Sequence, residues 1–411
     1  MTLTLDVARA RDAADPLHHK RADFLLPAGK IYLDGNSLGA LPRSTPPRIA
    51  ALVTQEWGED LIGSWNSAGW IDAPHTLGAR IASLIGADAD EVLVTDSTSV
   101  NLFKLLTAAC LARPDRTTIL SEPGNFPTDL YIADGVTRTL PGRRLRTVPA
   151  EDIVAAIDDD VAVVLLTHVH YKSGRRLDMA AITAAAHARG ALVLWDLSHS
   201  VGAVPVALNA CNADLAVGCG YKYLNGGPGA PAFLYVARAL QDTLRSPLTG
   251  WMGHDAPFAF TDDYRPASGI ARFLCGTPPI VAMGALEQGL AQFDGVDFAT
   301  LIAKSQALCE LFVAMVDDRC AGFDLTLLSP RDAGARGSHL SYAHPDAYAL
   351  CQALIARGVI GDFRAPDAIR FGFTPLYTGY EDVWRAVDIL ADILRTQVWD
   401  DPVYRRRATV T

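Results

Sequence analysis

The strongest constraint on the fold is an alternation of short apolar runs with helical stretches between about residues 75 and 285. In its middle, residues 161–166 form an unbroken apolar run rich in β-branched residues, which is typical of a strand buried on both faces. Asp178 and Gly190 give the start and stop signals of an alanine-rich helix, and another apolar strand follows at residues 191–195. This alternation predicts an α/β fold with a mostly parallel sheet flanked by helices.

The same pattern predicts the other elements around this sheet. We expect helices at residues 75–85 and 99–111, and further strands at residues 91–95, 117–121, 213–218 and 231–236. In sheets of this kind ligands bind at the carboxyl ends of the strands. The residues that follow each strand are therefore the first candidates for a functional site.

The pattern changes after about residue 288, where longer helices surround fewer strands. We expect a helix at residues 345–357, a strand at 368–373, and a capping box, Thr378 to Glu381, that opens a helix through Leu394. This predicts a smaller α+β domain, against which residues 1–60 pack through the extended segment 31–34. The predicted division is a large domain of residues 66–288 and a small domain of residues 1–65 with 289–411.

Composition narrows the class of protein. The chain has 411 residues, half of them apolar and a fifth charged, as expected of a globular protein with room for two domains. A formal net charge of −10 argues against nucleic acid or an anionic membrane as a general partner. Seven scattered cysteines without a Cys-x-x-Cys pair suit neither disulfides nor zinc. The start lacks signal-peptide features and we find no uncharged apolar run near the ~20 residues of a membrane helix, so we expect a cytoplasmic protein.

Lys222 and Asp196 form the most informative pair of residues in the chain. Lys222 lies between glycines just after the strand 213–218, and Asp196 follows the strand 191–195. Pyridoxal phosphate needs this pairing, because an amine forms a Schiff base with its aldehyde and an acid pairs with its pyridinium nitrogen. The alternative is a surface lysine in a turn and an aspartate that caps the next element.

Hydroxyl, aromatic and imidazole groups follow neighbouring strands. Thr98 and Ser99 open a helix and are candidate phosphate donors, with ordinary N-capping as the alternative. Phe126 could stack on a planar cofactor ring or be a core aromatic. His199, one turn beyond Asp196, has a structural hydrogen bond as its default role.

Two further groups need a decision between function and structure. His168 and His170 follow the strand 161–166, but no cysteine or carboxylate nearby completes a tetrahedral metal site. Arg370 lies in the middle of an apolar strand, where it binds either a substrate carboxylate or an internal acid.

Six motifs in their order along about residues 30–380 resemble those of the kynureninase family. These are Asp34-Gly-Asn-Ser-Leu-Gly39, Asn125-Phe-Pro-Thr-Asp129, Asp196-Leu-Ser-His-Ser-Val-Gly202, Gly220-Tyr-Lys-Tyr-Leu-Asn225, Gly250-Trp-Met-Gly-His254 and Gly276-Thr-Pro-Pro279. The resemblance implies a pyridoxal 5'-phosphate enzyme of fold type I, whose large domain has a mostly parallel sheet of the seven-stranded type.

The resemblance also implies roles for individual residues. Lys222 would hold the cofactor, Asp196 its ring nitrogen, and Tyr221 is a candidate proton donor. Arg370 would bind the substrate α-carboxylate, and Trp65 the substrate ring. The expected phosphate contacts are Thr98, Ser99, Tyr221, Trp251 and Thr277, and the expected ring contacts are Phe126, Pro127, Thr128, Asp129, Thr167 and His199.

The implied reaction is hydrolysis of L-kynurenine, with 3-hydroxykynurenine as a second candidate substrate, to anthranilate and L-alanine. This places the chain in tryptophan degradation by the kynurenine pathway, which also serves NAD biosynthesis, without need for a metal. The resemblance implies a homodimer with shared active sites, in which Trp251 and Thr277 reach the partner's site. The alternatives are a cysteine desulfurase or small-substrate aminotransferase of the same fold, and a non-catalytic ligand-binding relative. A Rossmann dehydrogenase is disfavoured because no Gly-x-Gly-x-x-Gly follows the first strand.

Overall fold

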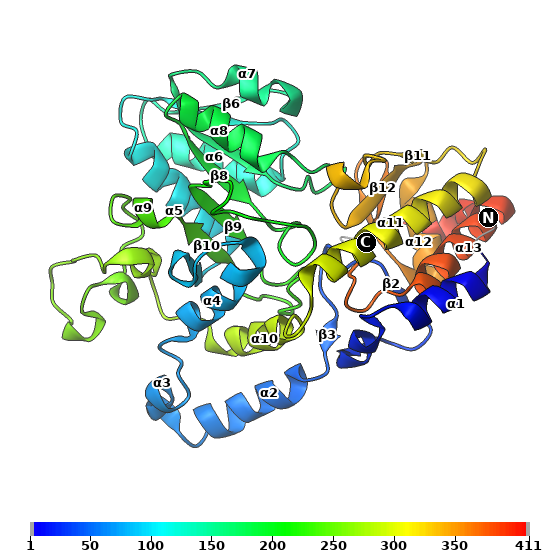
Figure 1. Cartoon of the computed structure of the whole chain (residues 1–411), viewed down its shortest axis with the longest axis horizontal. Coiled ribbons are helices and arrows are strands. Elements are labelled where there is room, and N and C mark those ends of the chain that lie inside the picture. Colours follow the sequence, from blue (N-terminus) through cyan, green and yellow to red (C-terminus); the bar gives the residue numbers. More distant parts are fainter. Residues whose placement is uncertain (1–3, 408–411) are drawn as a thin grey trace.

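The computed structural model describes residues 4–407, which form a seven-stranded sheet and a four-stranded sheet with helices around each (Figure 1). The first three and the last four residues of the terminal segments assigned to the predicted small domain lie outside the described residues.

The large sheet confirms the predicted mostly parallel arrangement. Its strand order is β4-β10-β9-β8-β7-β5-β6. Only β10 runs against its neighbours β4 and β9. The strands are β4 (Val92–Val94), β5 (Thr118–Ser121), β6 (Arg144–Thr147), β7 (Val161–Thr167), β8 (Leu192–Asp196), β9 (Leu215–Gly218) and β10 (Phe233–Val236).

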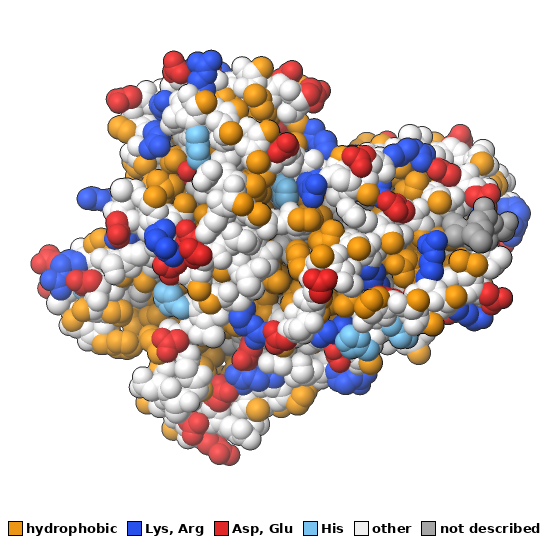
Figure 2. Space-filling view, in the orientation of Figure 1, with side chains coloured by type: hydrophobic (Ala, Val, Ile, Leu, Met, Phe, Trp, Pro, Cys, Tyr) orange, Lys and Arg blue, Asp and Glu red, His pale blue; other side chains and the backbone are white. Residues whose placement is uncertain are grey.

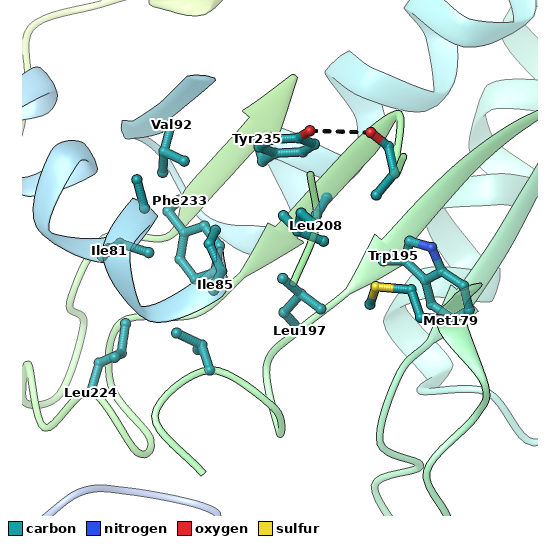
Figure 3. Packing of buried hydrophobic residues seen from close by; sticks show 14 of the residues in the cluster. Ile81, Ile85, Val92, Met179, Trp195, Leu197, Leu208, Leu224, Phe233 and Tyr235 are labelled. Atoms are coloured by element: carbon teal, nitrogen blue, oxygen red, sulfur yellow. Dashed lines mark hydrogen bonds between the residues drawn. The ribbon is translucent and has the colours of Figure 1, made fainter. Parts of the chain in front are cut away.

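Helices cover both faces of this sheet, which explains the unbroken apolar sequence of β7. Val163 and Leu165 face one core cluster with residues of α5 and α6, while Val164 and Leu166 face another with residues of α4 and α8. In Figure 3, side chains of α4 pack against Phe233 of β10. The covering helices are α4 (Ala73–Ile85), α5 (Thr98–Leu111), α6 (Pro127–Thr139) and α8 (Met179–Ala188), and the shorter α7 (Ile153–Ala156) and α9 (Arg238–Gln241) lie in connections.

The four-stranded sheet is antiparallel, with the order β11-β12-β15-β14. It packs against three helices through a second core. Its strands are β11 (Thr326–Leu327), β12 (His339–Ala343), β14 (Asp362–Arg364) and β15 (Ala368–Gly372), and the helices are α11 (Phe298–Arg319), α12 (Ala347–Ala356) and α13 (Tyr380–Thr396).

The first part of the N-terminal segment lies beside this second sheet, whereas residues 45–51 pack on a helix of the predicted large domain. Strand β2 (Ile31–Tyr32) pairs in parallel with β13 (Val359–Ile360), and α1 (Leu5–Ala14) packs on α13. A hairpin-like pair, β1 (Phe24–Leu25) with β3 (Leu41–Pro42), leads to α2 (Thr45–Ala51), which packs on α10 (Ile280–Ala291), and then to α3 (Ser64–Ser67). The division into residues 66–288 and residues 1–65 with 289–411 stays a proposal.

The predicted capping box of α13 is wrong by one residue. Gly379, not Thr378, precedes the helix, and the side chain of Asp382, not Glu381, accepts its backbone N–H at 2.9 Å. Asp12 of α1 accepts the next two backbone N–H groups, at 2.7 and 2.8 Å. A carboxylate from a distant helix thus takes the donors that a local box would have used.

Within residues 4–407, α11 is long and apolar enough, by length and composition alone, to cross a membrane. More than half of its apolar 18-residue stretch is buried inside the protein, where α11 packs on α13. Lys304 in this helix pairs with the buried Asp15 at 2.6 Å. These are the features of a core helix.

Candidate active site

The Lys222 amine is buried and uncommitted. The residue is 7% exposed and lies in the loop after β9, whose backbone is tied to the N-terminal segment by a Gly39 N–H bond to Tyr221. Its Nζ lies 5.6 Å from the centre of the Phe126 ring and 5.7 Å from that of Tyr221. Among residues 4–407 none forms a hydrogen bond or ion pair with Nζ. The loop therefore holds a free amine beside two aromatic rings.

Two buried carboxyl groups, Asp129 and Asp196, share the space next to this amine. Asp196 ends β8 and accepts the backbone N–H of Ser198 at 2.7 Å, while Asp129 lies in the first turn of α6. Burial raises the pKa of both carboxyl groups, and the Asp196 charge raises the pKa of Asp129 further. Oδ1 of Asp129 has no hydrogen-bond partner. The pair is thus short of positive charge, although Lys222 lies near it.

The loop before α6 is fixed by a network that reaches the end of β7. The backbone N–H of Phe126 donates to Asn125 Oδ1 at 2.7 Å, and Thr167 donates to the same oxygen. Thr167 Oγ1 also lies 3.3 Å from Asp129 Oδ2. Phe126 precedes α6 and packs edge-on against Tyr171, with ring centres 5.3 Å apart. The predicted ring contacts Phe126, Asp129 and Thr167 therefore lie together, with Pro127 and Thr128 between the first two.

The turn between β4 and α5 faces a cavity of about 530 Å³. Ser97 is the N-cap of α5 and accepts the Val100 backbone N–H at 3.4 Å, so the cap is not one of the predicted donors Thr98 and Ser99. Those two residues open the helix and keep backbone N–H groups for an anion. The cavity is lined by Ser97, Tyr221 and Thr277, among others.

Tyr221 brings a phenol to the lining of this cavity, to which Asp96 also belongs. Its neighbour Cys219, followed by burial, raises the pKa of the phenol. A proton therefore stays on its hydroxyl at neutral pH.

The histidines do not gather around a metal position. His168 Nδ1 lies 2.9 Å from Ser200 Oγ, and His170 Nε2 lies 2.7 Å from the Gly124 carbonyl oxygen. His199 Nε2 lies 3.1 Å from the Asn36 carbonyl oxygen. No group of three His, Cys, Asp or Glu residues in the described part of the chain could hold a metal.

Arg370 takes part in an internal ion pair. It is 1% exposed, and its Nε and Nη2 donate to the two oxygens of Asp362. Nη2 also donates to Ser37 Oγ at 3.0 Å, and Nη1 to the Tyr171 carbonyl at 2.6 Å. Arg364 lies 2.7 Å from the same carboxylate. Of the two possibilities left open, the internal acid is present, and one N–H of Nη1 is left for a ligand.

Trp65 and Trp251, predicted for the substrate ring and the phosphate, lie against each other within one chain. Their ring centres are 6.4 Å apart, and Trp70, Phe258 and Phe260 extend the group. The contact joins α3 to the loop that follows α9.

Sequence reasoning missed three residues close to this site. Asp362 binds Arg370, and the side chains of Asn36 and His339 are fully buried without a hydrogen-bond partner. Asn36 stands in the Asp34–Gly39 motif but was given no role. For His339 and Asp362 no local pattern exists, because the sheet pairing brings them to the site.

Pyridoxal phosphate fits these residues. An uncommitted buried amine, an unpartnered oxygen on Asp129, and an acid pair whose burial the Lys222 charge only partly offsets are what an aldehyde with a protonated ring nitrogen would satisfy. Phe126 offers a ring face, and the start of α5 offers N–H groups to a phosphate.

Relatives of known family match the chain over nearly its whole length. A family model described as the kynureninase C-terminal domain matches residues 301–390. The chain is 53% identical to a kynureninase of Pseudomonas fluorescens, covering 98% of each chain. It is also 53% identical to a kynureninase of Burkholderia mallei, covering 99% of this chain and 100% of that one.

Solved structures share the fold at lower identity. A cysteine desulfurase from Thermococcus onnurineus NA1, in its apo form, has a TM-score of 0.79 at 18% identity, covering 92% of this chain and 98% of that one. A C-DES mutant with glycine covalently linked to the PLP cofactor has a TM-score of 0.76 at 17% identity, covering 90% and 99%. At such identities these structures show the fold alone. The likeness to the curated relatives shows more: this chain belongs to the kynureninase family.

Proposed function

We propose that this protein hydrolyses the Cβ–Cγ bond of L-kynurenine and releases anthranilate and L-alanine, with pyridoxal 5'-phosphate as its cofactor. The observation that carries the proposal is the buried Lys222 amine, which lies 5.6 and 5.7 Å from two aromatic ring centres and near Asp129 and Asp196. The 53% identity to kynureninases over 98% of each chain supports the same reaction.

Pyridoxal phosphate supplies an electron-withdrawing ring that stabilises negative charge on carbon next to an amino group. Lys222 is the residue that would hold its aldehyde carbon. Asp196, at the end of β8, would hold the ring nitrogen, and Asp129 would support Asp196. Phe126 would lie on the ring, with Thr98 and Ser99 at the phosphate.

Lys222 and Tyr221 are suited to moving protons. Once the substrate amino group has replaced it, the Lys222 amine is free to remove the proton from Cα of the substrate. The Tyr221 hydroxyl keeps its proton because its pKa is raised, and it can donate that proton to Cβ after the carbon–carbon bond has broken. Water adds to the γ-carbonyl, so that the aryl fragment leaves as a carboxylic acid.

The two ends of the substrate are held by different parts of the chain. Arg370 is proposed to bind the α-carboxylate through the N–H of Nη1 that Asp362 and Tyr171 leave free. Trp65 is proposed to contact the aromatic ring, since it belongs to the aromatic group around Trp251.

A desulfurase has less support. Such an enzyme needs a reactive thiol, but burial raises the pKa of Cys219 and keeps it protonated. The solved desulfurases resemble this chain only at the level of the fold.

Two measurements test the proposal. The purified protein should be yellow, and borohydride should fix a pyridoxyl group on the peptide that contains Lys222. Lys172→Ala serves as the control, because Lys172 Nζ already donates to the Ala365 carbonyl at 3.1 Å. Anthranilate fluorescence should then appear with L-kynurenine, and 3-hydroxykynurenine should be compared in parallel. A label on another lysine contradicts the cofactor assignment, and the absence of anthranilate contradicts the reaction.

We also propose a homodimer in which Trp251 and Thr277 serve the partner's site. Exposed apolar side chains support it: Ile62 is 79% and Phe260 is 75% exposed, on segments that protrude from the large sheet (Figures 1 and 2). Exposed apolar side chains of this kind suit contact with a second copy of the chain. The cytoplasm stays the predicted location.

Mixing two inactive variants tests the shared site. Lys222→Ala chains mixed with Trp251→Ala/Thr277→Ala chains should recover part of the activity, because one site of each mixed dimer is intact. Thr277 lines a cavity together with Tyr221 of its own chain, so a site built from a single chain is the alternative. If mixed dimers form without activity, each site is built from a single chain.

A further inference from the structure

Arg370 alone does not complete a carboxylate site. A guanidinium has five N–H donors. In Arg370 the Nε donor and one Nη2 donor bind Asp362, the other Nη2 donor binds Ser37, and one Nη1 donor binds the Tyr171 carbonyl. The two-pronged face that usually grips a carboxylate is therefore occupied by an internal one. A substrate carboxylate needs further donors close by.

His339 and Asn36 lie on the same face of the sheet as Arg370. In the pairing of β12 with β15, His339 lies opposite Gly372 and Ser341 lies opposite Arg370. His339 and Arg370 are thus diagonal neighbours on one face of the sheet, a spacing of about 7–8 Å. Gly372 has no side chain, and Asn36 fills the space above it: a Cβ on Gly372 would lie 1.9 Å from Asn36 Oδ1.

Both side chains are fully buried and have no hydrogen-bond partner. This holds for both ring nitrogens of His339 and for both the nitrogen and the oxygen of the Asn36 amide. The amide therefore offers a free NH₂ group whichever way round it is placed. Buried polar groups without partners cost free energy and are uncommon, and a ligand that uses them is a direct explanation.

The surroundings keep His339 neutral. Burial lowers its pKa to about 3, and the charges of Arg370 and Lys222 act in the same direction. A neutral imidazole has one N–H to donate and one lone pair to accept. Its ring centre lies 5.3 Å from that of His199, whose Nε2 contacts the Asn36 carbonyl oxygen at 3.1 Å. His339 and Asn36 thus belong to one polar group, and the Lys222 charge acts on its histidine by lowering the pKa.

We propose that Asn36 and His339 bind the α-carboxylate of the amino-acid substrate and supply the hydrogen-bond donors that Arg370 spends on Asp362. The proposal rests on the proposed function in one respect, which is that the ligand is an α-amino acid. The binding energy comes from two charge-assisted N–H bonds inside a site from which water is excluded.

The test measures ligand binding to the cofactor-loaded protein, not turnover. L-Alanine is the probe because it carries the α-amine and the carboxylate without the aromatic ring, and ethylamine is the matched probe without the carboxylate. Binding of each is followed by the change in the visible absorbance of the cofactor. Asn36→Leu and His339→Leu should each raise the Kd for L-alanine about tenfold or more. The affinity for ethylamine should stay at the parent value.

Stability and rescue separate binding from a structural role. Removal of an unpartnered polar group should leave the melting temperature of the substrate-free variants at or above the parent value, and His339→Gln should recover L-alanine binding. Thr107→Val is the control, since Thr107 also carries a buried unpartnered hydroxyl but lies within α5. Parent affinity for L-alanine in both leucine variants would overturn the proposal, as would an equal loss for both probes. Anthranilate release by the unmodified chain tests the reaction separately.

Discussion

Replacing Arg370 by lysine tests both its ion pair with Asp362 and its proposed binding of the α-carboxylate. The change keeps the positive charge and removes the planar pair of N–H donors of the guanidinium. Arg370 is 1% exposed and binds both oxygens of Asp362, which is itself buried. A lysine ammonium is a single donor atom at the end of a flexible chain, so it can reach only one of those oxygens at a time.

The size of the effect follows from the contacts. Arg370 donates four hydrogen bonds, of which lysine can keep about two, so the change removes about two charge-assisted hydrogen bonds, worth about 1.5–3 kcal/mol each. Arg364, 2.7 Å from Asp362, still compensates that carboxylate. The loss of stability should therefore lie at the lower end of the sum, at about 3 kcal/mol. The α-carboxylate would also be displaced by about 1 Å, which should lower kcat/KM about a hundredfold.

Two assays are needed, denaturant unfolding for stability and anthranilate fluorescence for kcat/KM. Arg364→Lys is the matched control, because Arg364 contacts the same Asp362 carboxylate at 2.7 Å but its side chain is 35% exposed, so water can replace part of the lost hydrogen bonding and the loss of stability should be smaller. Cofactor content should stay normal, since the predicted cofactor contacts lie around the other sheet. A parent-like rate would show that the carboxylate binds elsewhere, and parent-like stability would show that the Asp362 pair contributes nothing to the fold.

Three further changes test other parts of the argument. Lys104→Met removes a fully buried ammonium that donates to Asp96, in the turn before α5, at 2.7 Å. We expect about 2–3 kcal/mol less stability and weaker retention of the cofactor in dialysis. Unchanged stability and retention would show that Lys104 does not support this turn. Burial, followed by a neighbouring carboxylate, raises the pKa of Asp34 to about 7. The folded protein then keeps a proton that the unfolded chain releases near pH 3.8, and stability falls as the pH rises between these values. The free energy of unfolding of Asp34→Asn should therefore rise relative to that of the parent by up to about 1.4 kcal/mol per pH unit in that window. Equal pH dependence of the unfolding free energy in the two proteins would contradict this. Gly372→Ala should displace Asn36, lower stability by about 1–3 kcal/mol and weaken L-alanine binding, whereas parent-like calorimetry would show that the contact yields freely.

Local sequence was enough for six of the seven strands of the large sheet, but it missed the edge strand β6, whose residues 144–147 include two arginines and form no apolar run. The apolar run at residues 161–166 predicted β7, because a strand covered on both faces cannot alternate with polar residues. Asp178 and Gly190 predicted the ends of α8 to within two residues, since caps are satisfied by their own neighbours. The motifs around Lys222 and Asp196 predicted the cofactor, because its chemistry needs an amine and an acid at one edge of the sheet.

Other features depend on residues that are distant along the chain. Asp12 takes the N–H groups at the start of α13, and no pattern near residue 379 could reveal it. Asp362 reaches Arg370 only through the pairing of β14 with β15, and His339 reaches the same face through β12.

The sequence by itself determined most strands of the large sheet, the family and the chemistry of the cofactor pair, because these follow from local periodicity, motifs or residue type. It did not reveal β6, α6, β12 or β14. Tertiary structure alone decided which N–H donors of Arg370 already bind Asp362. It also decided that the buried side chains of Asn36 and His339 have no hydrogen-bond partner. Hydrogen-bond satisfaction is a property of contacts in three dimensions, because each donor binds whichever acceptor the packing brings within about 3 Å.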